Sequence, residues 1–276
     1  MSTSTLRIGV LMPEVLGTYG DSGNALILAE RARRRGIDAE VVHVGLTEEI
    51  PDSLDIYTLG GGEDTAQALA ADKFRGTSGL ARALDAGRPL LAICASLQVL
   101  GHWYEDARGV RVPGMGVLDI TTRPQGHRAI GELVCEPVLN GLTQTLTGFE
   151  NHGGGTVLGP DASPLGRVIS GVGNGTPQGE EVPEVRYDGA VQGSVIATYM
   201  HGPALARNPE LADLLLERAT GATLEPLDVP GVAELREERL IRDQSSELLT
   251  ADSAQRSPVC YVGTFSSICA AYSRVE

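Results

Sequence analysis

The sequence predicts an α/β protein with a doubly wound, mostly parallel sheet, helices on both faces of that sheet and an added antiparallel β region. Strand-like apolar runs alternate with helix-compatible segments through the first hundred residues, which is typical of a parallel sheet. The apolar run over 89–93 passes directly into a helix-compatible segment at Cys94. After Gly114, short β-like runs follow one another with few helices between them. A flavodoxin-like core with extra strands accounts for all three observations.

The first part of the chain reads as successive strand–helix units. Strands are predicted over residues 6–12, 39–44, 54–59 and 89–93. The first helix follows Asp21 or Ser22, either of which can be its N-cap, and Gly36 closes it behind a cationic last turn. Further helices are predicted over 65–74 and 78–86 and directly after Cys94. In such sheets ligands bind beyond the carboxyl ends of the strands, so we expect functional residues in the loops at that edge.

The second part of the chain is richer in β structure. Short strands that flank or extend the parallel sheet are predicted over residues 115–122, 129–136, 145–149 and 184–187. The glycine-rich segment 171–179 predicts an exposed loop. A β-branched, apolar strand beginning at 194 ends at His201, where Gly202 and Pro203 break it, and a surface helix follows over 209–219. Residues 1–227 are predicted to form one domain, and 228–276 a C-terminal helix (about 231–242) with a flexible tail.

Composition narrows the function classes. The 276-residue chain is 42% hydrophobic, has no apolar run near the ~20 residues of a membrane helix and begins without a signal peptide, which predicts a cytoplasmic protein. Its net charge of −14 argues against nucleic-acid or anionic-membrane partners. The cysteines are scattered, with no CxxC pair and no zinc spacing, so no metal site is expected. Lys73 is the only lysine and no GxxxxGK[ST] loop is present, so any ATP is expected on another chain.

Cys94 is the first candidate catalytic residue. Its place on a sharp strand-to-helix turn exposes the side chain to a ligand, and the N-terminus of the following helix favours a thiolate. Free cysteines more often serve as small buried hydrophobic residues, so the position alone does not establish a nucleophile. A base and oxyanion donors at the same sheet edge would favour the catalytic interpretation.

His201 is the best candidate base by position. If its strand is parallel to the strand before Cys94, the two residues reach the same edge of the sheet. His152 is the second candidate, while His43 is predicted in mid-strand, His102 in the helix after Cys94, and His127, like His152, in a loop. A cysteine and a histidine so placed are two parts of acyl-transfer chemistry.

The glycine-rich loop over residues 60–64 (GGGED) supplies the candidate oxyanion hole. Amides of Gly61 or Gly62, together with the amide of Ala95, can bind a developing oxyanion, which is worth on the order of 3 kcal/mol per donor. A plain tight turn is the simpler interpretation of three glycines. The convergence of this loop with Cys94 and His201 favours the catalytic interpretation.

These motifs resemble a known family, the class I (triad-type) glutamine amidotransferases, in their cobyric-acid-synthase-like branch. The resemblance rests on residues 93–98 (ICASLQ) as the nucleophile elbow, 60–64 as the oxyanion loop and 199–202 (YMHG) as the histidine motif. Within this branch, residues 19–24 (YGDSGN) and 148–153 (GFENHG) resemble the GatD family, the glutaminase subunits of lipid II isoglutaminyl synthases. The resemblance covers roughly residues 6–220 of the predicted domain.

The resemblance implies a subunit of a heterodimer. It implies that this chain hydrolyses L-glutamine through a Cys94 thioester and passes ammonia to a Mur-ligase-like partner, MurT. The partner would use ATP and Mg to activate the D-glutamate α-carboxylate of lipid II, which becomes D-isoglutamine in peptidoglycan synthesis at the inner face of the membrane. No cofactor or metal is expected in this chain. The alternatives are a glutaminase for another acceptor, such as a corrinoid carboxylate, and a non-catalytic flavodoxin-like binding module with an inert Cys94.

Two departures from the family pattern matter. Ala92 and Ser96 stand where the elbow usually has glycines, which predicts a less tight turn. Pro203 stands where the third triad member, a glutamate two residues after the histidine, is commonly found. We therefore expect a Cys94–His201 dyad in this chain and hypothesise that the partner supplies a carboxylate to orient His201.

Substrate contacts are predicted at Arg128 and Gln98 first. A guanidinium can pair bidentately with the α-carboxylate of glutamine, although Arg128 reads equally well as a solvated loop charge. Gln98 lies one turn into the elbow helix, where a surface or capping role is the alternative. The resemblance adds Asn151, His152 and Gly153 as substrate-binding residues.

Overall fold

The computed structural model describes residues 5–17, 19–106, 108–234 and 236–238. The chain divides into two compact units, Met1–Leu224 and Glu225–Glu276, which are treated separately. The first unit contains every named helix and strand. In the second, residues 232–234 and 236–238 are helical, while the predicted helix beyond 238 and the predicted tail over 243–276 lie outside the described residues.

A six-stranded sheet forms the centre of the first unit, in the order β11-β12-β4-β3-β1-β2. Its strands are β1 (Leu6–Leu11), β2 (Ala39–Val44), β3 (Ile56–Leu59), β4 (Leu90–Ile93), β11 (Ala190–Gln192) and β12 (Val195–Thr198). All neighbouring pairs are parallel except β11 and β12. The central strands β3, β4 and β12 are buried throughout, because helices cover both faces of a doubly wound sheet. The predicted parallel sheet is confirmed.

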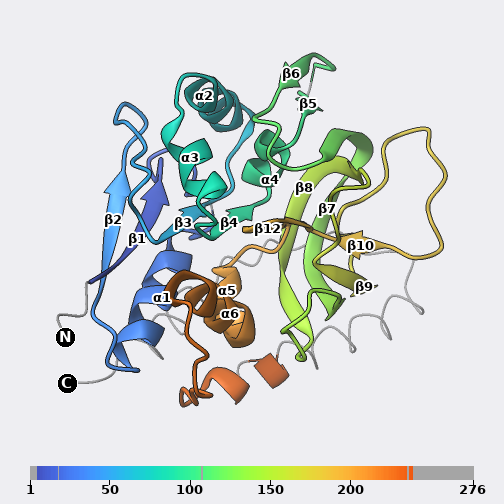
Figure 1. Cartoon of the computed structure of the whole chain (residues 1–276). Helices are drawn as coiled ribbons and strands as arrows, with labels where there is room; N and C mark the ends of the chain where they lie inside the picture. Colours follow the sequence, from blue (N-terminus) through green and yellow to red (C-terminus); the bar gives the residue numbers. More distant parts are fainter. Residues whose placement is uncertain (1–4, 18, 107, 235, 239–276) are drawn as a thin grey trace. The chain divides into compact units, whose positions relative to one another are not determined.

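Six helices accompany this sheet: α1 (Gly23–Arg33), α2 (Asp64–Arg75), α3 (Gly79–Asp85), α4 (Ala95–Leu100), α5 (Ala204–Arg207) and α6 (Pro209–Thr220). Figure 1 shows α2, α3 and α4 above the sheet and α1, α5 and α6 below it. A bidentate ion pair from the buried Arg31 of α1 to Asp213 of α6, at 2.7 and 2.6 Å, joins the lower helices. Among the described residues, no helix has both the length and the apolar character needed to cross a membrane.

The antiparallel region forms a second sheet and does not extend the first. Its order is β10-β9-β7-β5-β6, with β8 also paired to β7. The strands are β5 (Trp103–Glu105), β6 (Arg111–Pro113), β7 (Ile120–Pro137), β8 (Leu146–Leu158), β9 (Gly166–Ser170) and β10 (Tyr187–Asp188). Figure 1 shows β7 and β8 as two long, curved neighbours beside the first sheet.

Three predicted positions are corrected by this second sheet. His127 lies in β7 and His152 in β8, so neither is in a loop. The β7–β8 register shifts between Pro124 and Ala129, and this irregularity admits residues that read as turn-forming. His102 lies beyond the elbow helix, since α4 ends at Leu100 and the extended Gly101 leads into β5.

Four loops meet at the carboxyl edge of the parallel sheet because β1, β3, β4 and β12 all run in one direction. The β1–α1 and β3–α2 loops are in direct contact there. A Cβ on Gly60 would lie 2.2 Å from the Leu16 carbonyl oxygen, so only glycine permits this approach. Sequence-distant loops are thereby held in one fixed arrangement.

Replacing Gly60 by alanine tests this contact. We expect Gly60→Ala to lower the free energy of unfolding by about 1–3 kcal/mol, because the added Cβ forces two backbone segments apart. Gly76→Ala is the matched control, since a Cβ there would meet the carbonyl oxygens of Lys73 and Asp72 at the ordinary contact distances of 3.6 and 4.0 Å; its effect should stay within about 0.5 kcal/mol. Urea denaturation of both variants measures the difference, and equal midpoints would contradict the close approach.

Candidate active site

Cys94 lies on the turn between β4 and α4, as the sequence predicts. Its backbone has φ 51° and ψ −105°, a conformation that residues with a Cβ rarely adopt and that costs on the order of 1–3 kcal/mol. The Cys94 amide donates to the Thr198 carbonyl (2.8 Å), which continues the β4–β12 pairing into the turn. Cys94 also lines a cavity, although it is only 6% exposed. The strained turn directs this residue to a cavity, which argues against a merely packing role.

The two residues that replace the expected glycines fit the elbow without opening it. Ala92 and Ser96 are fully buried. The Ser96 hydroxyl donates to the Gly60 carbonyl at 2.5 Å, so the elbow helix holds the glycine loop in place. The backbone at Cys94 is strained despite these larger neighbours, so the predicted relaxation of the turn is not seen.

His201 follows β12 and arrives at the same edge as Cys94. The register pairs Thr198 with Ile93, so each candidate lies just beyond its own strand. The imidazole is almost fully buried. The backbone of His201 pairs with that of Phe149 in β8 through hydrogen bonds of 2.8 and 3.3 Å. A Cβ on Gly61 would lie 2.6 Å from Cε1 of His201 and 3.3 Å from Cβ of Cys94, so both side chains flank that glycine.

Asp21 supplies the carboxylate that the sequence seemed to lack. Its Oδ2 lies 2.9 Å from Nδ1 of His201, and Asp21 is fully buried. The expectation of an unassisted dyad in this chain is therefore wrong. The loop after β1 delivers the acid from 180 residues away in sequence, and Pro203, two residues after His201, is the N-cap residue of α5. Asp21 makes no helix cap; Ser22 is at the N-cap, without a side-chain cap bond.

The charges around His201 favour its protonated form. Burial alone would lower the pKa of the imidazole. The negative charges of the Cys94 thiolate and the Asp21 carboxylate, together with the hydrogen bond to Asp21, outweigh burial and raise the pKa of His201 to about 10. An imidazolium between two anionic groups can hold a thiolate and later donate a proton.

The glycine loop contributes differently from the prediction. The Gly61 amide donates to Oδ2 of Asp21 at 2.8 Å, so it is already used and cannot be the oxyanion donor first proposed. Gly62 and Ala95 line the cavity together with Cys94. Ala95 opens α4, where backbone amides point out of the helix without partners in the first turn. Gly62 and Ala95 remain the candidate pair.

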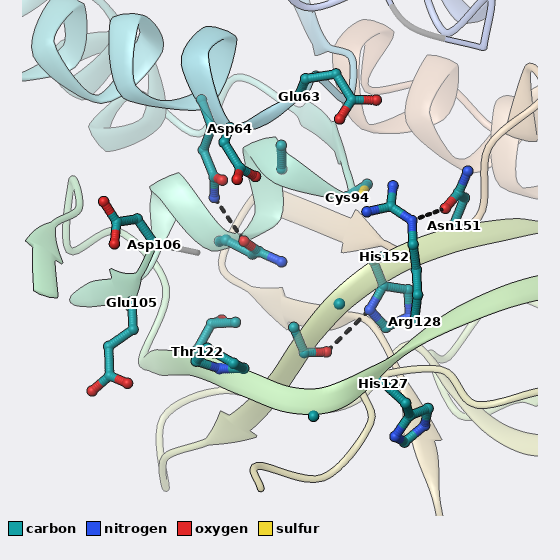
Figure 2. A pocket seen from close by; sticks show the side chains of 18 residues that line it. Glu63, Asp64, Cys94, Glu105, Asp106, Thr122, His127, Arg128, Asn151 and His152 are labelled. Atoms are coloured by element: carbon teal, nitrogen blue, oxygen red, sulfur yellow. Dashed lines mark hydrogen bonds between the residues drawn. The ribbon is translucent and has the colours of Figure 1, made fainter. Parts of the chain in front are cut away.

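The cavity beside Cys94 has a volume of about 340 Å³ and brings the predicted substrate residues together. Arg128, Gln98, Asn151, His152 and Gly153 all line it. Figure 2 shows Arg128 rising from β7 between Cys94 and Asn151. Nε of Arg128 donates to Oδ1 of Asn151 at 2.5 Å, so the exposed guanidinium is held at the wall of the cavity.

Behind the cavity, a buried polar network fixes Gln98. Its Nε2 donates to the Tyr199 hydroxyl at 3.0 Å, and its Oε1 accepts from Gln67 of α2 at 2.6 Å. Tyr199 is stacked against His152 with 3.8 Å between ring centroids. His152 lies 3.6 Å from Glu150, whose two oxygens accept the amides of residues 172 and 173. His152 thus forms a wall of the cavity. Among the described residues, no hydrogen bond links it to the Asp21–His201 pair.

Four carboxylates also line the cavity. They come from the start of α2 and from the β5–β6 hairpin: Glu63, Asp64, Glu105 and Asp106. Figure 2 shows Asp64, Asp106 and Glu105 across the cavity from Arg128. Opposite charges on opposite walls suit a small zwitterion. The sequence analysis missed these acids, and the GGGED motif was the available signal for the first two.

Comparison with known proteins agrees with this geometry. Residues 7–209 match the family model of the CobB/CobQ-like glutamine amidotransferase domain. Subunit GatD of lipid II isoglutaminyl synthase (glutamine-hydrolysing) from Staphylococcus aureus strain N315 is 36% identical over 246 residues, which cover 87% of this chain and 96% of that protein. The subunit of that name from Streptococcus pneumoniae R6 is 32% identical, covering 90% and 93%. A probable cobyric acid synthase from Methanothermobacter thermautotrophicus is 35% identical over 162 residues, covering 55% of this chain and 31% of that protein. The chain belongs to the CobB/CobQ-like family of glutamine amidotransferases.

Proposed function

We propose that this chain hydrolyses L-glutamine at Cys94 and delivers the ammonia to a partner subunit. The observation that carries the proposal is the strained elbow at Cys94, which opens on one cavity with Arg128 and lies beside the buried His201–Asp21 pair. A nucleophile, a base with its orienting acid and a carboxylate-binding cation are thereby gathered at one edge of the sheet. These are the parts that hydrolysis of a free amino-acid amide requires.

The chemistry follows from the charges in the site. The Cys94 thiolate attacks the carboxamide carbon of glutamine, and the developing oxyanion accepts hydrogen bonds from the amides of Gly62 and Ala95. His201 donates its proton to the leaving nitrogen, so the C–N bond breaks, ammonia departs and a thioester remains. Water then attacks the thioester while His201 takes a proton from it. Glutamate and the thiolate are released, and the new carboxyl group loses its proton to solvent.

The walls of the cavity orient the substrate in this proposal. Arg128 binds the α-carboxylate of glutamine, aimed by its bond to Asn151. Asp64 and its neighbouring carboxylates face the α-ammonium group. Gln98, fixed by Gln67 and Tyr199, lies between these groups and the elbow helix. Together they select a zwitterionic amide over a simple one.

The amide acceptor is proposed to be lipid II, bound by the partner. Two relatives that this chain covers almost fully are named as the GatD subunit of lipid II isoglutaminyl synthase. We infer a Mur-ligase-like partner of the MurT type, which binds ATP and Mg and activates the D-glutamate α-carboxylate. The absence of a GxxxxGK[ST] loop from this sequence supports such a division of labour. A corrinoid acceptor is less well supported, since the chain spans about a third of the cobyric acid synthase it resembles.

Glutamine hydrolysis and its nucleophile are tested together. We expect the purified chain, with its partner, to release glutamate and ammonia from glutamine, and Cys94→Ala to reduce the rate by on the order of 10³-fold or more. The glutamine-like electrophile 6-diazo-5-oxo-norleucine should label Cys94, as read by mass spectrometry. Cys135→Ala is the matched control, because that thiol is fully buried in β7 and burial raises its pKa strongly. Labelling nowhere in the wild-type chain would favour a non-catalytic binding module.

The role of Asp21 is tested by Asp21→Asn. Removing the negative charge lowers the pKa of His201 from about 10, so the alkaline limb of the kcat/KM profile should move to lower pH. The loss of imidazole orientation should also reduce kcat by on the order of 10²-fold or more. Asp85→Asn, an exposed position at the end of α3, is the control and should leave the profile unchanged. A profile that keeps its alkaline limb in Asp21→Asn, with the partner present, would return the orienting role to a partner carboxylate.

The acceptor is tested by reconstitution. We expect a Mur-ligase-like protein to co-purify with the chain from its native cell, and the complex to amidate lipid II when given glutamine, ATP and Mg. Mass spectrometry would show the loss of about 1 Da that accompanies conversion of a carboxyl to a carboxamide. Cys94→Ala in the complex should retain this activity with free ammonia and lose it with glutamine. Amidation of a corrinoid carboxylate in place of lipid II would overturn the assignment.

A further inference from the structure

Tyr19 stands out in the loop that carries Asp21. Its φ is +60°, in the left-handed region that residues with a large side chain rarely enter. Such a conformation persists only where surrounding contacts hold it. The residue precedes Gly20 and Asp21, so the same short loop presents both an aromatic ring and the acid to the site. The contacts of Tyr19 therefore indicate what the strained conformation achieves.

Tyr19 makes two separate contacts with the site. Its ring lies against the His201 imidazole in an edge arrangement, with 4.8 Å between centroids and 60° between planes. Its hydroxyl accepts a hydrogen bond from Nδ2 of Asn151. Asn151 in turn accepts a bond from Nε of Arg128 at 2.5 Å. One side chain thus touches the base directly and reaches the guanidinium through a single intermediate.

The chemistry of the three groups fixes the direction of this chain of bonds. A guanidinium has only donors, so Asn151 must turn its carbonyl oxygen toward Arg128. The amide nitrogen of Asn151 then needs an acceptor, and the Tyr19 hydroxyl is the acceptor that the structure provides. Arg128 thus holds the oxygen end of the Asn151 amide and the Tyr19 hydroxyl holds its nitrogen end, so loss of the hydroxyl leaves Asn151 with one hydrogen bond fewer to fix its position. The phenol therefore determines how firmly Arg128 is aimed.

We propose that Tyr19 is a positioning residue that joins the α-carboxylate site to the catalytic pair. Its hydroxyl sets Asn151 and thereby Arg128, while its ring lies edge-on against the His201 imidazole. Glutamine held correctly by Arg128 is thus aligned through the same loop that carries Asp21. This inference rests on the proposed glutaminase function and adds a residue that selects substrates bearing an α-carboxylate.

The test separates the hydroxyl from the ring by using two substrates. We expect Tyr19→Phe to raise KM for glutamine about tenfold, as for one lost hydrogen bond near 1.4 kcal/mol, with kcat within about threefold of wild type. 4-Aminobutyramide is the same amide without the α-carboxylate, and its kcat/KM should be unchanged by this substitution. Tyr187 is an exposed tyrosine on β10, and Tyr187→Phe is the control. It should leave the kinetic constants for both substrates unchanged.

The ring is tested by Tyr19→Leu. This variant should lower kcat for both substrates at least tenfold, because His201 loses the ring that lies against it, and thermal unfolding should show that the fold is retained. An unchanged KM for glutamine in Tyr19→Phe, measured on an active wild-type complex, would overturn the inference and leave the proposed function standing. Equal losses for both substrates in Tyr19→Phe would also overturn it, since the hydroxyl would then act through the fold. A wild-type complex without any glutamine hydrolysis would overturn both proposals.

Discussion

The parallel pairing of β4 with β12 is the constraint on which the site depends. It joins segments about a hundred residues apart and sets Thr198 beside Ile93. Because both strands run in the same direction, Cys94 and His201 emerge at one edge, and the bond from the Cys94 amide to the Thr198 carbonyl carries the pairing into the turn. A register slip of one residue would turn every side chain of β12 to the opposite face of the sheet and separate His201 from Cys94. The apolar burial of both strands is what prevents such a slip.

Around this pairing, one side-chain carboxylate and a close backbone approach hold the remaining parts together. Oδ2 of Asp21 bonds both Nδ1 of His201 and the amide of Gly61, so one oxygen anchors the base and the glycine loop. Gly61 has no room for a Cβ, since that atom would fall 2.6 Å from the imidazole. The loop glycines therefore serve close approach first, and the Gly61 amide completes the shell of Asp21 instead of facing the substrate. This explains why a glycine-rich sequence that looks like an oxyanion loop supplies fewer free amides than its glycine count suggests.

The parallel sheet and the positions of Cys94 and His201 could be predicted from the sequence, because alternating apolar runs and strand ends are local patterns. The sequence was insufficient for Asp21, whose partner lies 180 residues away and whose place before a helix favoured a capping interpretation. Arg128 and His152 were placed in loops because glycines and a proline surround them, whereas pairing across the long β7–β8 hairpin overrides those local preferences. The Tyr19–Asn151–Arg128 chain depends on side-chain orientation in three segments, which no periodicity encodes. Hydrogen-bond partners between distant loops were thus the part that needed the structure.

Two buried carboxyl groups near the end of β12 differ in how their charge is handled. Asp21 faces the His201 cation, so its charge is compensated where the reaction needs it. Asp188 of β10 accepts from the Thr198 hydroxyl at 2.5 Å and the Tyr199 amide at 3.1 Å, yet burial dominates and raises its pKa to about 7. Because this folded-state pKa lies above the ordinary value of 3.8, Asp188 favours folding most below that value and loses its contribution as pH rises toward about 7. The pair Thr198 and Tyr199 that leads to His201 is therefore held by a carboxyl that is largely neutral in mild acid, while the catalytic end keeps its ionised groups. Burial thus suppresses the charge of Asp188 behind the site in mild acid, while pairing with His201 compensates the charge of Asp21 within it.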